Sequence, residues 1–399
     1  PPHAPGAAAA PGAAPCAGAR GLRFIELFAG IGGFRAALEA LGGRCVFASE
    51  IHPTARAVYC ENWARGDACG EGTLCGDIRL VPVDEIPEHE LLTAGFPCQP
   101  FSALGDQAGL DEARGRLFLQ VARVLRGRRP AAALLENVPG LLGTDEGRAL
   151  EAVLGELRAS GYRVAHRVYS SGALLPQKRK RVYFVAIRAD LHGACERFRF
   201  PWLPDLRRAL REILEEPPLA ELTALLLSED RWLRVRESRA FGEAPEDILG
   251  APDALAAPLV SSYGQGGAGS FAKYTQLIPT AEDGPAAGRP RRLSARECAR
   301  LQGFPKDFTW AACDGPRAWY RLIGNAVSPP VVCALAGALG CALCCATGAC
   351  KLPGTAAAVR LALAAGPTDL EAELLRRTVD GPRGEATTLE ALLRALEAA

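Results

Sequence analysis

The 399-residue chain has no methionine, only five histidines and almost no excess of either charge. Its 46 Lys and Arg residues face 45 Asp and Glu residues, which leaves a formal net charge of +1. A protein that coats nucleic acid through its overall charge is far more basic, so contact with a polyanion would need a local basic surface. Because even the first residue is not methionine, we interpret the chain as a trimmed or partial gene product.

The pattern of a transmembrane helix or a secretory signal is also missing. The most apolar stretch, residues 331–346, is short and interrupted by glycine, so it predicts a buried helix and no membrane partner. The 14 cysteines are irregularly spaced, which disfavours a disulfide scaffold and indicates a reducing compartment. We therefore expect an intracellular protein, nuclear in a eukaryote and cytoplasmic in a bacterium. Cys341 and Cys344 have zinc-like spacing, but no second pair or histidine follows, so we expect no metal site.

Short apolar runs alternate with helical stretches between residues 22 and 189, and hydrophobic residues make up 49% of the chain. This alternation predicts an α/β fold with a doubly wound, mostly parallel sheet. The expected strands are Leu22–Phe28, Arg44–Ser49, Leu91–Gly95, Ala131–Leu135, Tyr162–Tyr169 and Arg181–Ile187. The expected helices are Gly33–Leu41, Pro53–Trp63, 115–127 and 146–159.

Composition divides the rest of the chain into four further parts. Residues 1–20 are rich in Pro, Ala and Gly and predict a disordered leader. Residues 190–290, with Pro-rich turns, a Gly-rich segment and one helical piece at Asp205–Glu216, predict a smaller irregular domain. The helical pattern returns in 291–345, and 346–399 form a partly helical tail without an assigned role.

Two helices in the 291–345 part have clear start signals. Ser294 and Glu297 form a capping box that opens a helix over Ala295–Gln302, and Gly303 ends it. Another helix is predicted to begin at Pro329, since proline lacks an N–H that the first turn would leave unpaired.

A glycine-rich turn follows the first strand and indicates a ligand site. Its glycines allow close backbone approach and open a helix whose N-terminus favours negative charge. Glu50, at the end of the second strand, is placed to accept both hydroxyls of a ribose, and Asp77 is a third candidate contact, to the adenine amino group. Together they indicate an adenosine-containing cofactor in a Rossmann-like cleft; the alternatives are a plain strand–helix turn and an ordinary turn aspartate. The turn reads Phe28-Ala29-Gly30-Ile31-Gly32-Gly33.

Cys98 stands just after the predicted strand Leu91–Gly95, at the edge where parallel sheets bind ligands. The following segment contains glycine and serine, as a mobile lid would. A cysteine in a chain with 14 of them is more often a small core residue, so position alone leaves both readings open.

Two further strand ends carry polar side chains. Glu136 follows a buried strand, which should raise its pKa and suit it to proton donation near neutrality. Arg179 and Arg181 share one face of the segment that leads into the last strand, where guanidinium groups suit carbonyl or phosphate recognition. A solvated basic turn is the alternative reading of this second element.

These elements, in this order, resemble the motifs of the DNA cytosine-5 methyltransferases. The resemblance covers residues from about Leu22 to about Leu339 and includes two more segments, 296–305 and 324–327. It implies the Rossmann-like fold of class I S-adenosylmethionine-dependent methyltransferases, with 21–189 as the catalytic domain and 190–290 as the target-recognition domain. It also implies that the Ala295–Gln302 helix supports the target-recognition domain.

The resemblance further implies roles for individual residues. Cys98 would attack C6 of a flipped cytosine, Glu136 would bond or protonate N3, Arg181 would hold O2 and Arg179 would organise the pocket. S-adenosylmethionine would contact the turn residues Phe28, Ala29, Gly30, Ile31, Gly32 and Gly33. It would also contact Glu50, Ile51, Asp77, Ile78, Pro97, Asn325 and Val327. The substrate side would include Gln99, Ser102, Asn137 and Gln177.

Three alternatives compete with this interpretation. A Rossmann oxidoreductase would explain the turn and Glu50 but not Cys98 or Glu136, and an inactive regulatory relative would be expected to lack one of those two residues. A eukaryotic branch of the family methylates tRNA. The single proline before Cys98 and the missing Cys-Phe-Thr signature of that branch favour double-stranded DNA, whereas the Tyr-Gly and Gly-Ser pairs between 263 and 270 resemble that branch. We expect a monomer that acts on DNA, with tRNA as the alternative.

Overall fold

The computed structural model describes residues 21–63, 74–97, 112–263, 276–281, 286, 288–347, 378–380 and 386–388. The predicted leader, Cys98, Gln99 and Ser102 lie outside these residues.

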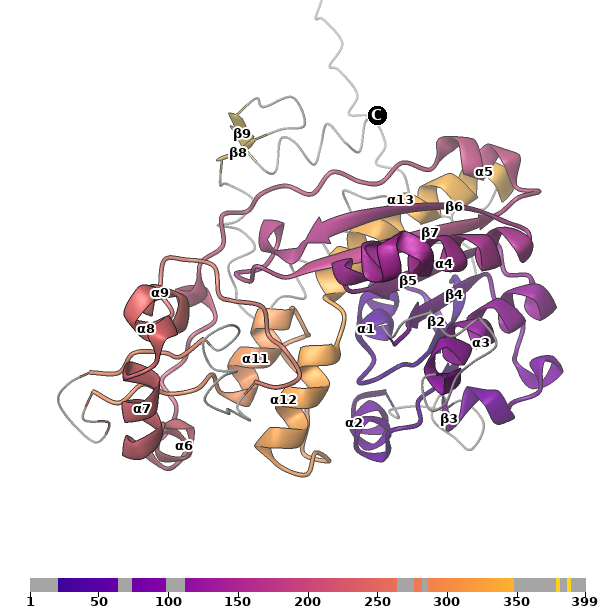
Figure 1. The fold of residues 1–399 in the computed structure, drawn as a ribbon. Helices are drawn as coiled ribbons and strands as arrows, with labels where there is room; N and C mark the ends of the chain where they lie inside the picture. The colour runs from indigo at the N-terminus through magenta and orange to yellow at the C-terminus, as the bar shows by residue number, and fades with distance from the viewer. Residues whose placement is uncertain are drawn as a thin grey trace, which may run out of the picture.

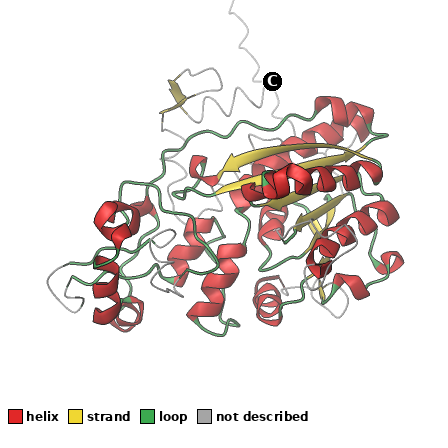
Figure 2. Ribbon diagram, viewed as in Figure 1, coloured by secondary structure: helices red, strands yellow, loops and turns green. Residues whose placement is uncertain are grey.

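A seven-stranded sheet forms the centre of the fold, in the order β3-β2-β1-β4-β5-β7-β6 (Figures 1 and 2). The strands β1 to β5 pair in parallel, whereas β7 runs antiparallel to both β5 and β6. Their bounds are Arg23–Leu27, Arg44–Ser49, Leu74–Cys75, Leu91–Gly95, Ala132–Asn137, Tyr162–Ser170 and Lys180–Arg188 for β1 to β7. The six predicted strands and the mostly parallel sheet are confirmed, and β3, which is only two residues long, was not predicted.

Helices cover both faces of this sheet. On one face α1 (Gly33–Ala40), α5 (His192–Arg197) and α13 (Pro329–Thr347) share a core with β1, β5 and β7. On the other, α3 (Glu112–Arg128) and α4 (Arg148–Ala159) pack on the opposite side chains of the same strands. Successive strand residues point to opposite faces, so the near-continuous apolar runs of the sequence supply both cores.

The stretch Pro316–Cys344 is long enough to cross a membrane, and its most apolar 18-residue window has a mean hydropathy of 1.9. However, 83% of its most apolar window is buried against the rest of the protein, as in the core helix of a globular fold. It contains α12 (Pro316–Asn325), which the sequence analysis did not assign, and most of α13, whose predicted start at Pro329 is confirmed.

The region after β7 differs from the prediction. The expected helix over Asp205–Glu216 is wrong, because only the 3-10 turn Leu210–Glu212 forms there. The backbone N–H groups of Leu206 and Leu210 donate to the carbonyls of Ala173 and Ala254, so long-range bonds replace helical ones. Four short helices that were not predicted follow: α6 (Leu219–Leu225), α7 (Glu229–Arg236), α8 (Arg239–Glu243) and α9 (Pro245–Ile248).

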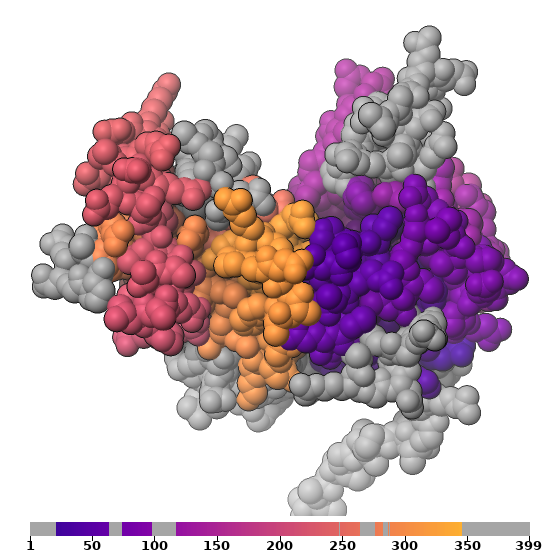
Figure 3. All heavy atoms as spheres, turned by 90° about the horizontal axis from the view of Figure 1, so that it is seen from below, coloured from indigo at the N-terminus to yellow at the C-terminus, as the bar shows by residue number. Residues whose placement is uncertain are grey.

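Seen from below, this region and the sheet stand on either side of residues 290–345, and the surface is hollowed between them (Figure 3). In the described part of the tail, β8 (Thr378–Asp380) pairs with β9 (Ala386–Thr388). The other residues after Thr347, to which the expectation of partial helix applies, lie outside the described residues.

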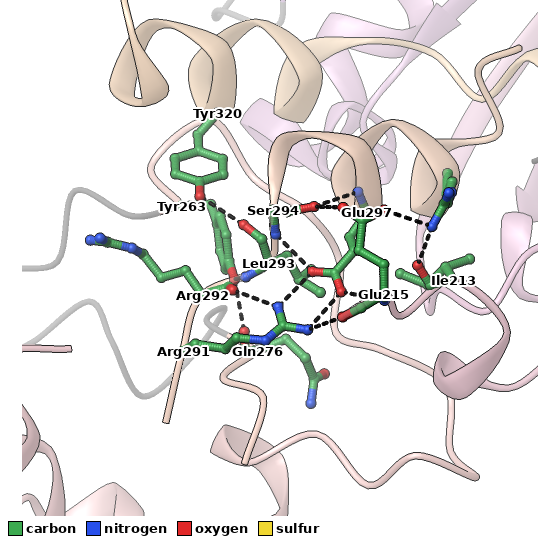
Figure 4. A network of polar contacts seen from close by, with 11 residues as sticks. Ile213, Glu215, Tyr263, Gln276, Arg291, Arg292, Leu293, Ser294, Glu297 and Tyr320 are labelled. Atoms are coloured by element: carbon green, nitrogen blue, oxygen red, sulfur yellow. Dashed lines mark hydrogen bonds and ion pairs between the residues drawn. The ribbon is translucent and has the colours of Figure 1, made fainter. Parts of the chain in front are cut away.

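The helix α11 (Ala295–Gln302) is bonded to the irregular region through a buried polar network (Figure 4). Glu297 completes the predicted capping box with Ser294, whose Oγ also donates to Glu215 at 2.7 Å. Both carboxylate oxygens of Glu297 accept from the guanidinium of Arg291 at 2.7 Å, and one accepts from the backbone of Glu215. Gly303 ends the helix in the left-handed conformation, at φ +83°. The network bonds α11 to the backbone and side chains around Glu215 and Arg291. That this helix supports a target-recognition domain stays a prediction.

Candidate active site

A cavity of about 670 Å³ opens at the carboxyl ends of β1, β2, β4 and β5, where open α/β sheets bind ligands. Side chains from α12 and the segment after it close its other side. The cavity extends from the ends of β1 and β2, the cofactor end, to the ends of β5 and β7, the substrate end.

The turn after β1 lines the cofactor end through Phe28, Ala29, Gly30, Ile31 and Gly33. Gly30 has φ +56° and open space where a Cβ would lie, so backbone atoms alone border the cavity there. At Gly33 a Cβ would lie 2.7 Å from a methyl group of Val327, so glycine is required for the C-terminal segment to pack on α1.

Gly32 is required for a different reason. It has φ +85°, and its Cβ would lie 2.2 Å from the indole nitrogen of Trp63. It is absent from the residues that line the cavity, so it supports the turn without facing a ligand.

Glu50 is fixed by backbone donors at the end of β2. Its Oε2 accepts from the N–H of Gly30 at 2.8 Å and its Oε1 from the N–H of His52 at 2.7 Å. A carboxylate oxygen has two lone pairs, so each oxygen keeps acceptor capacity toward the cavity that Glu50 lines. This is the arrangement that recognition of a ribose diol needs. Next to it, Ile51 is 63% exposed and offers an apolar surface to a flat ring.

Asp77 and Ile78 line the cavity below β3. The Asp77 carboxylate accepts from the Arg79 guanidinium at 2.5 to 2.9 Å and from its N–H at 3.0 Å. These hydrogen bonds lower the pKa of Asp77, because they stabilise the charged form. Arg79 therefore donates to both oxygens of the carboxylate that was expected to contact an adenine amino group. Arg79 would have to give up its hydrogen bonds to at least one of these oxygens before Asp77 could accept from a ligand.

Asn137 connects β5 to the segment before Cys98. Its Nδ2 donates to the carbonyl of Phe96 at 3.0 Å, and its Oδ1 accepts from the N–H of Val138 at 2.8 Å. Pro97 and Asn137 both line the cavity. Asn137 thus fixes the backbone two residues before Cys98.

Glu136 is the central group of the substrate end. Its side chain is 9% exposed, and Nε of Arg181 lies 3.0 Å from its Oε1. The alignment is that of an ion pair and not of a hydrogen bond, so Oε1 has no hydrogen-bond partner in the described part of the chain. Burial raises the pKa of Glu136, although Arg181 and Arg179 lower it in part, which confirms the predicted direction. A buried carboxyl with an open hydrogen-bonding position is suited to protonating a substrate atom.

Arg179 and Gln177, also predicted for this site, do not line the cavity. Arg179 is 1% exposed and donates to the carbonyls of Leu259, Gly324 and Ala326 at 2.7 to 3.1 Å. Burial and the charge of Arg181 lower its pKa to about 9. Gln177 donates to Leu301 and Gln302 and accepts from Leu259. Both side chains fix the backbone behind the cavity.

Asn325 and Val327 line the cavity from the C-terminal side. The carbonyl between them, that of Ala326, is held by Arg179 and by the Gln302 amide. The buried arginine therefore positions the segment that carries both residues.

Sequence reasoning missed several charged or polar lining residues, among them Glu26, His52 and Arg321. Glu26 on β1 accepts from the N–H of Phe34 at 3.2 Å, and burial raises its pKa to about 8. His52 and Arg321 meet at the edge of the cavity, with 2.7 Å between their side-chain nitrogens. The only signal for Arg321 was its helical spacing, four residues before Asn325.

The lining fits a nucleoside that carries a small zwitterion: acceptors at Glu50, an apolar surface at Ile51, a buried acid at Glu26 and a cation at Arg321. Within the described ranges no group of three His, Cys, Asp or Glu side chains could hold a metal ion.

The fold and this cavity define a class I S-adenosylmethionine-dependent methyltransferase architecture. Residues 22–341 match the family model described as C-5 cytosine-specific DNA methylase. The chain belongs to this family.

Relatives of known sequence agree. The type II methyltransferase M.DsaV of Dactylococcopsis salina is 37% identical over 324 residues, covering 79% of this chain and 85% of that protein. M.HhaI of Haemophilus parahaemolyticus is 32% identical, covering 77% and 90%. Among solved structures, the S. pombe Dnmt2 methyltransferase superposes with a TM-score of 0.60 at 21% identity, covering 81% of this chain and 98% of that one. That last likeness confirms the fold.

Proposed function

We propose that this protein transfers a methyl group from S-adenosylmethionine to C5 of cytosine in DNA, with Cys98 as the nucleophile. The observation that carries the proposal is Glu136, a buried carboxyl with a raised pKa and an open position beside Arg181. It lies in the same cavity as the backbone-held carboxylate of Glu50. Membership of the cytosine-5 family supports this reading.

Glu136 and Arg181 would recognise the polar edge of the base. A protonated Glu136 donates to N3 of cytosine, and Arg181 donates to O2. Protonation at N3 draws electron density from C6, so C6 becomes susceptible to a nucleophile. A cytosine can reach this buried pair only when it has left the base stack.

Cys98 would supply the nucleophile. Its thiolate forms a bond to C6, and the electrons of the C5–C6 double bond move to C5 as N3 takes the proton from Glu136. After methyl transfer a base removes the C5 proton, the double bond re-forms and the thiolate leaves. N3 then returns its proton to Glu136, which restores both residues.

The cofactor end would bind S-adenosylmethionine. This cofactor supplies a methyl group without the bonding electrons, which stay on the sulfur of the thioether product. Glu50 would accept the ribose hydroxyls, Ile51 would cover one face of the adenine, and Gly30 would admit the ligand against the backbone.

DNA is favoured over tRNA as the polymer. The relatives reported above include type II methyltransferases of bacteria, at 32–37% identity over more than three quarters of the chain. The hollow between the sheet and the irregular region offers a place for a duplex (Figure 3).

The test is a methylation assay on plasmid DNA and on total tRNA, followed by bisulfite sequencing, with Cys98→Ser as the control. We expect protected cytosines in the plasmid and none with the variant. Protected cytosines in tRNA alone would overturn the choice of polymer, and no product on either would overturn the proposed activity.

A further inference from the structure

Arg321 and His52 form a contact across the edge of the cavity that the activity proposed above does not use. Arg321 lies on α12 and His52 follows β2, yet Nη2 of Arg321 lies 2.7 Å from Nε2 of His52. Both residues line the cavity. The N–H of His52 also donates to Glu50, so the contact lies next to the carboxylate assigned to the ribose.

This part of the edge is held in place by other polar contacts between α2 (Pro53–Trp63) and the chain before α12. Glu61 accepts from the N–H groups of Ala311 and Ala312 at 3.0 and 2.8 Å. Thr54 donates to Asp314 at 3.3 Å. The positions of His52 and Arg321 therefore follow from the fold and not from their own contact alone.

The hydrogen bonding at His52 is incomplete. Its Nε2 faces the guanidinium, which can only donate, while its Nδ1 faces the N–H of Ala55 at 3.4 Å. A neutral imidazole has one acceptor nitrogen and a protonated one has none, so the ring cannot accept from both donors. An oxygen anion that accepts from both side chains resolves this: Nδ1 accepts from Ala55, while Nε2–H and the Arg321 guanidinium both donate to the anion.

The charges that line the cavity also favour an anion at this position. Of the three lining arginines in the described ranges, Arg79 is paired with Asp77 and Arg181 with Glu136. Arg321 contacts the imidazole and forms no ion pair with a described carboxylate within 4.0 Å. A cation placed in this way is a favourable partner for a ligand carboxylate.

We propose that Arg321 and His52 form the subsite for the α-carboxylate of the methionine part of the cofactor. The inference rests on the proposed function, in which the ligand carries one carboxylate, joined through a short chain to the ribose that Glu50 accepts. Both residues are binding residues and take no part in proton transfer.

The experiment compares two ligands on the full chain by titration calorimetry. S-adenosylhomocysteine carries the carboxylate, and 5′-methylthioadenosine shares its nucleoside and thioether but lacks the amino acid. For Arg321→Gln we expect the Kd for S-adenosylhomocysteine to rise about 10- to 100-fold, as for a lost charged hydrogen bond, and that for methylthioadenosine to stay within about twofold. Arg317→Gln, one turn earlier on α12 and outside the cavity lining, is the matched control and should leave both unchanged.

Equal weakening of both ligands by Arg321→Gln would overturn the carboxylate assignment and indicate a role in supporting the nucleoside site. Unchanged binding of both, with weaker binding to a DNA duplex, would overturn it in favour of a phosphate contact. If the unaltered protein bound neither ligand, the proposed function itself would fail.

Discussion

Two of the buried glutamate–arginine pairs, Glu297–Arg291 and Glu136–Arg181, have different surroundings. In the network beside α11, Glu297 is 0% exposed and its two oxygens accept four hydrogen bonds, from Arg291, Ser294 and Glu215. In the cavity, Glu136 faces Arg181 at 3.0 Å, and its Oε1 accepts no aligned hydrogen bond from a described residue.

The difference indicates a structural role for Glu297–Arg291 and a chemical role for Glu136–Arg181. A buried charge whose hydrogen-bonding positions are all filled holds segments together and has no capacity left for a ligand. A buried carboxyl with an open position keeps a raised pKa and a place for one more partner, which is what a proton donor needs. The two pairs should therefore respond to substitution in opposite ways.

The largest effect is expected for Glu136→Gln. The amide can still form a hydrogen bond but cannot transfer a proton, so methylation of DNA should slow by about 10²- to 10⁴-fold. The thermal midpoint of unfolding should stay close to that of the unaltered protein. Single-turnover transfer of a labelled methyl group measures the rate, and Glu151→Gln, an exposed residue of α4, is the matched control. A rate within tenfold of the unaltered protein would contradict the role of Glu136.

The opposite pattern is expected for Arg291→Met, which leaves the Glu297 charge buried without its partner. The free energy of unfolding should fall by about 3–5 kcal/mol. Urea unfolding measures the change. Arg291→Lys keeps a charge but loses the paired geometry, so its free energy of unfolding should lie between those of the unaltered protein and Arg291→Met. For comparison, Arg239→Met removes an exposed pair with Glu243 and should cost under about 1 kcal/mol. An equal loss of unfolding free energy in Arg291→Met and Arg239→Met would contradict the supporting role of the buried Glu297–Arg291 pair.

A third buried carboxyl, Glu26, has an intermediate environment and should give stability a pH dependence. Burial raises its pKa from 4.5 to about 8. The folded protein thus holds this proton more tightly than the unfolded chain, so the stabilisation is complete below pH 4.5 and is lost as the pH rises toward 8. Compared with Glu26→Gln, the unaltered protein should lose about 4 kcal/mol between pH 5 and pH 9. Urea unfolding at each pH measures the change. If the free energies of unfolding of the two proteins changed with pH in the same way, Glu26 would not have the raised pKa.

The smallest effect is expected for Ser294→Ala, which removes the side-chain oxygen that caps α11 and the bond to Glu215. A lost N-cap costs about 1 kcal/mol, so the urea midpoint should shift slightly and methylation should continue at the unaltered rate. A large loss of methylation with unchanged stability would mean that this network takes part in the chemistry.

Much of the fold could be predicted from the sequence because its signals are local. Each predicted strand is a short apolar run, and the capping box at Ser294 needs only residues within one helical turn. The short helices α6 to α9 have at most a single local start signal, such as Ser238 before α8 or Pro245 in α9. Helices of four to eight residues form in water only with support from packing. The segment 205–216 has helical spacing, but its backbone bonds to residues far along the chain.

The same distinction applies to the site. Glu50 and Gly30 follow strand ends and Glu136 lies at the end of β5, so their convergence was predictable from the sheet. Arg321 and His52 are 269 residues apart, and no local pattern indicates that they meet. For Arg179 the motif predicted a role at the site but not its partners. Only the structure shows that it binds three backbone carbonyls.

The most direct test of the proposed chemistry is covalent trapping on DNA that carries 5-fluorocytosine at the target position. Fluorine at C5 cannot leave as a proton does, so the Cys98–C6 bond cannot break after methyl transfer. With S-adenosylmethionine present, we predict a denaturation-resistant protein–DNA adduct whose mass includes one methyl group and whose cross-linked peptide contains Cys98. Methylation of ordinary DNA without any adduct on the fluorinated strand, or an adduct that persists in Cys98→Ser, would contradict the account.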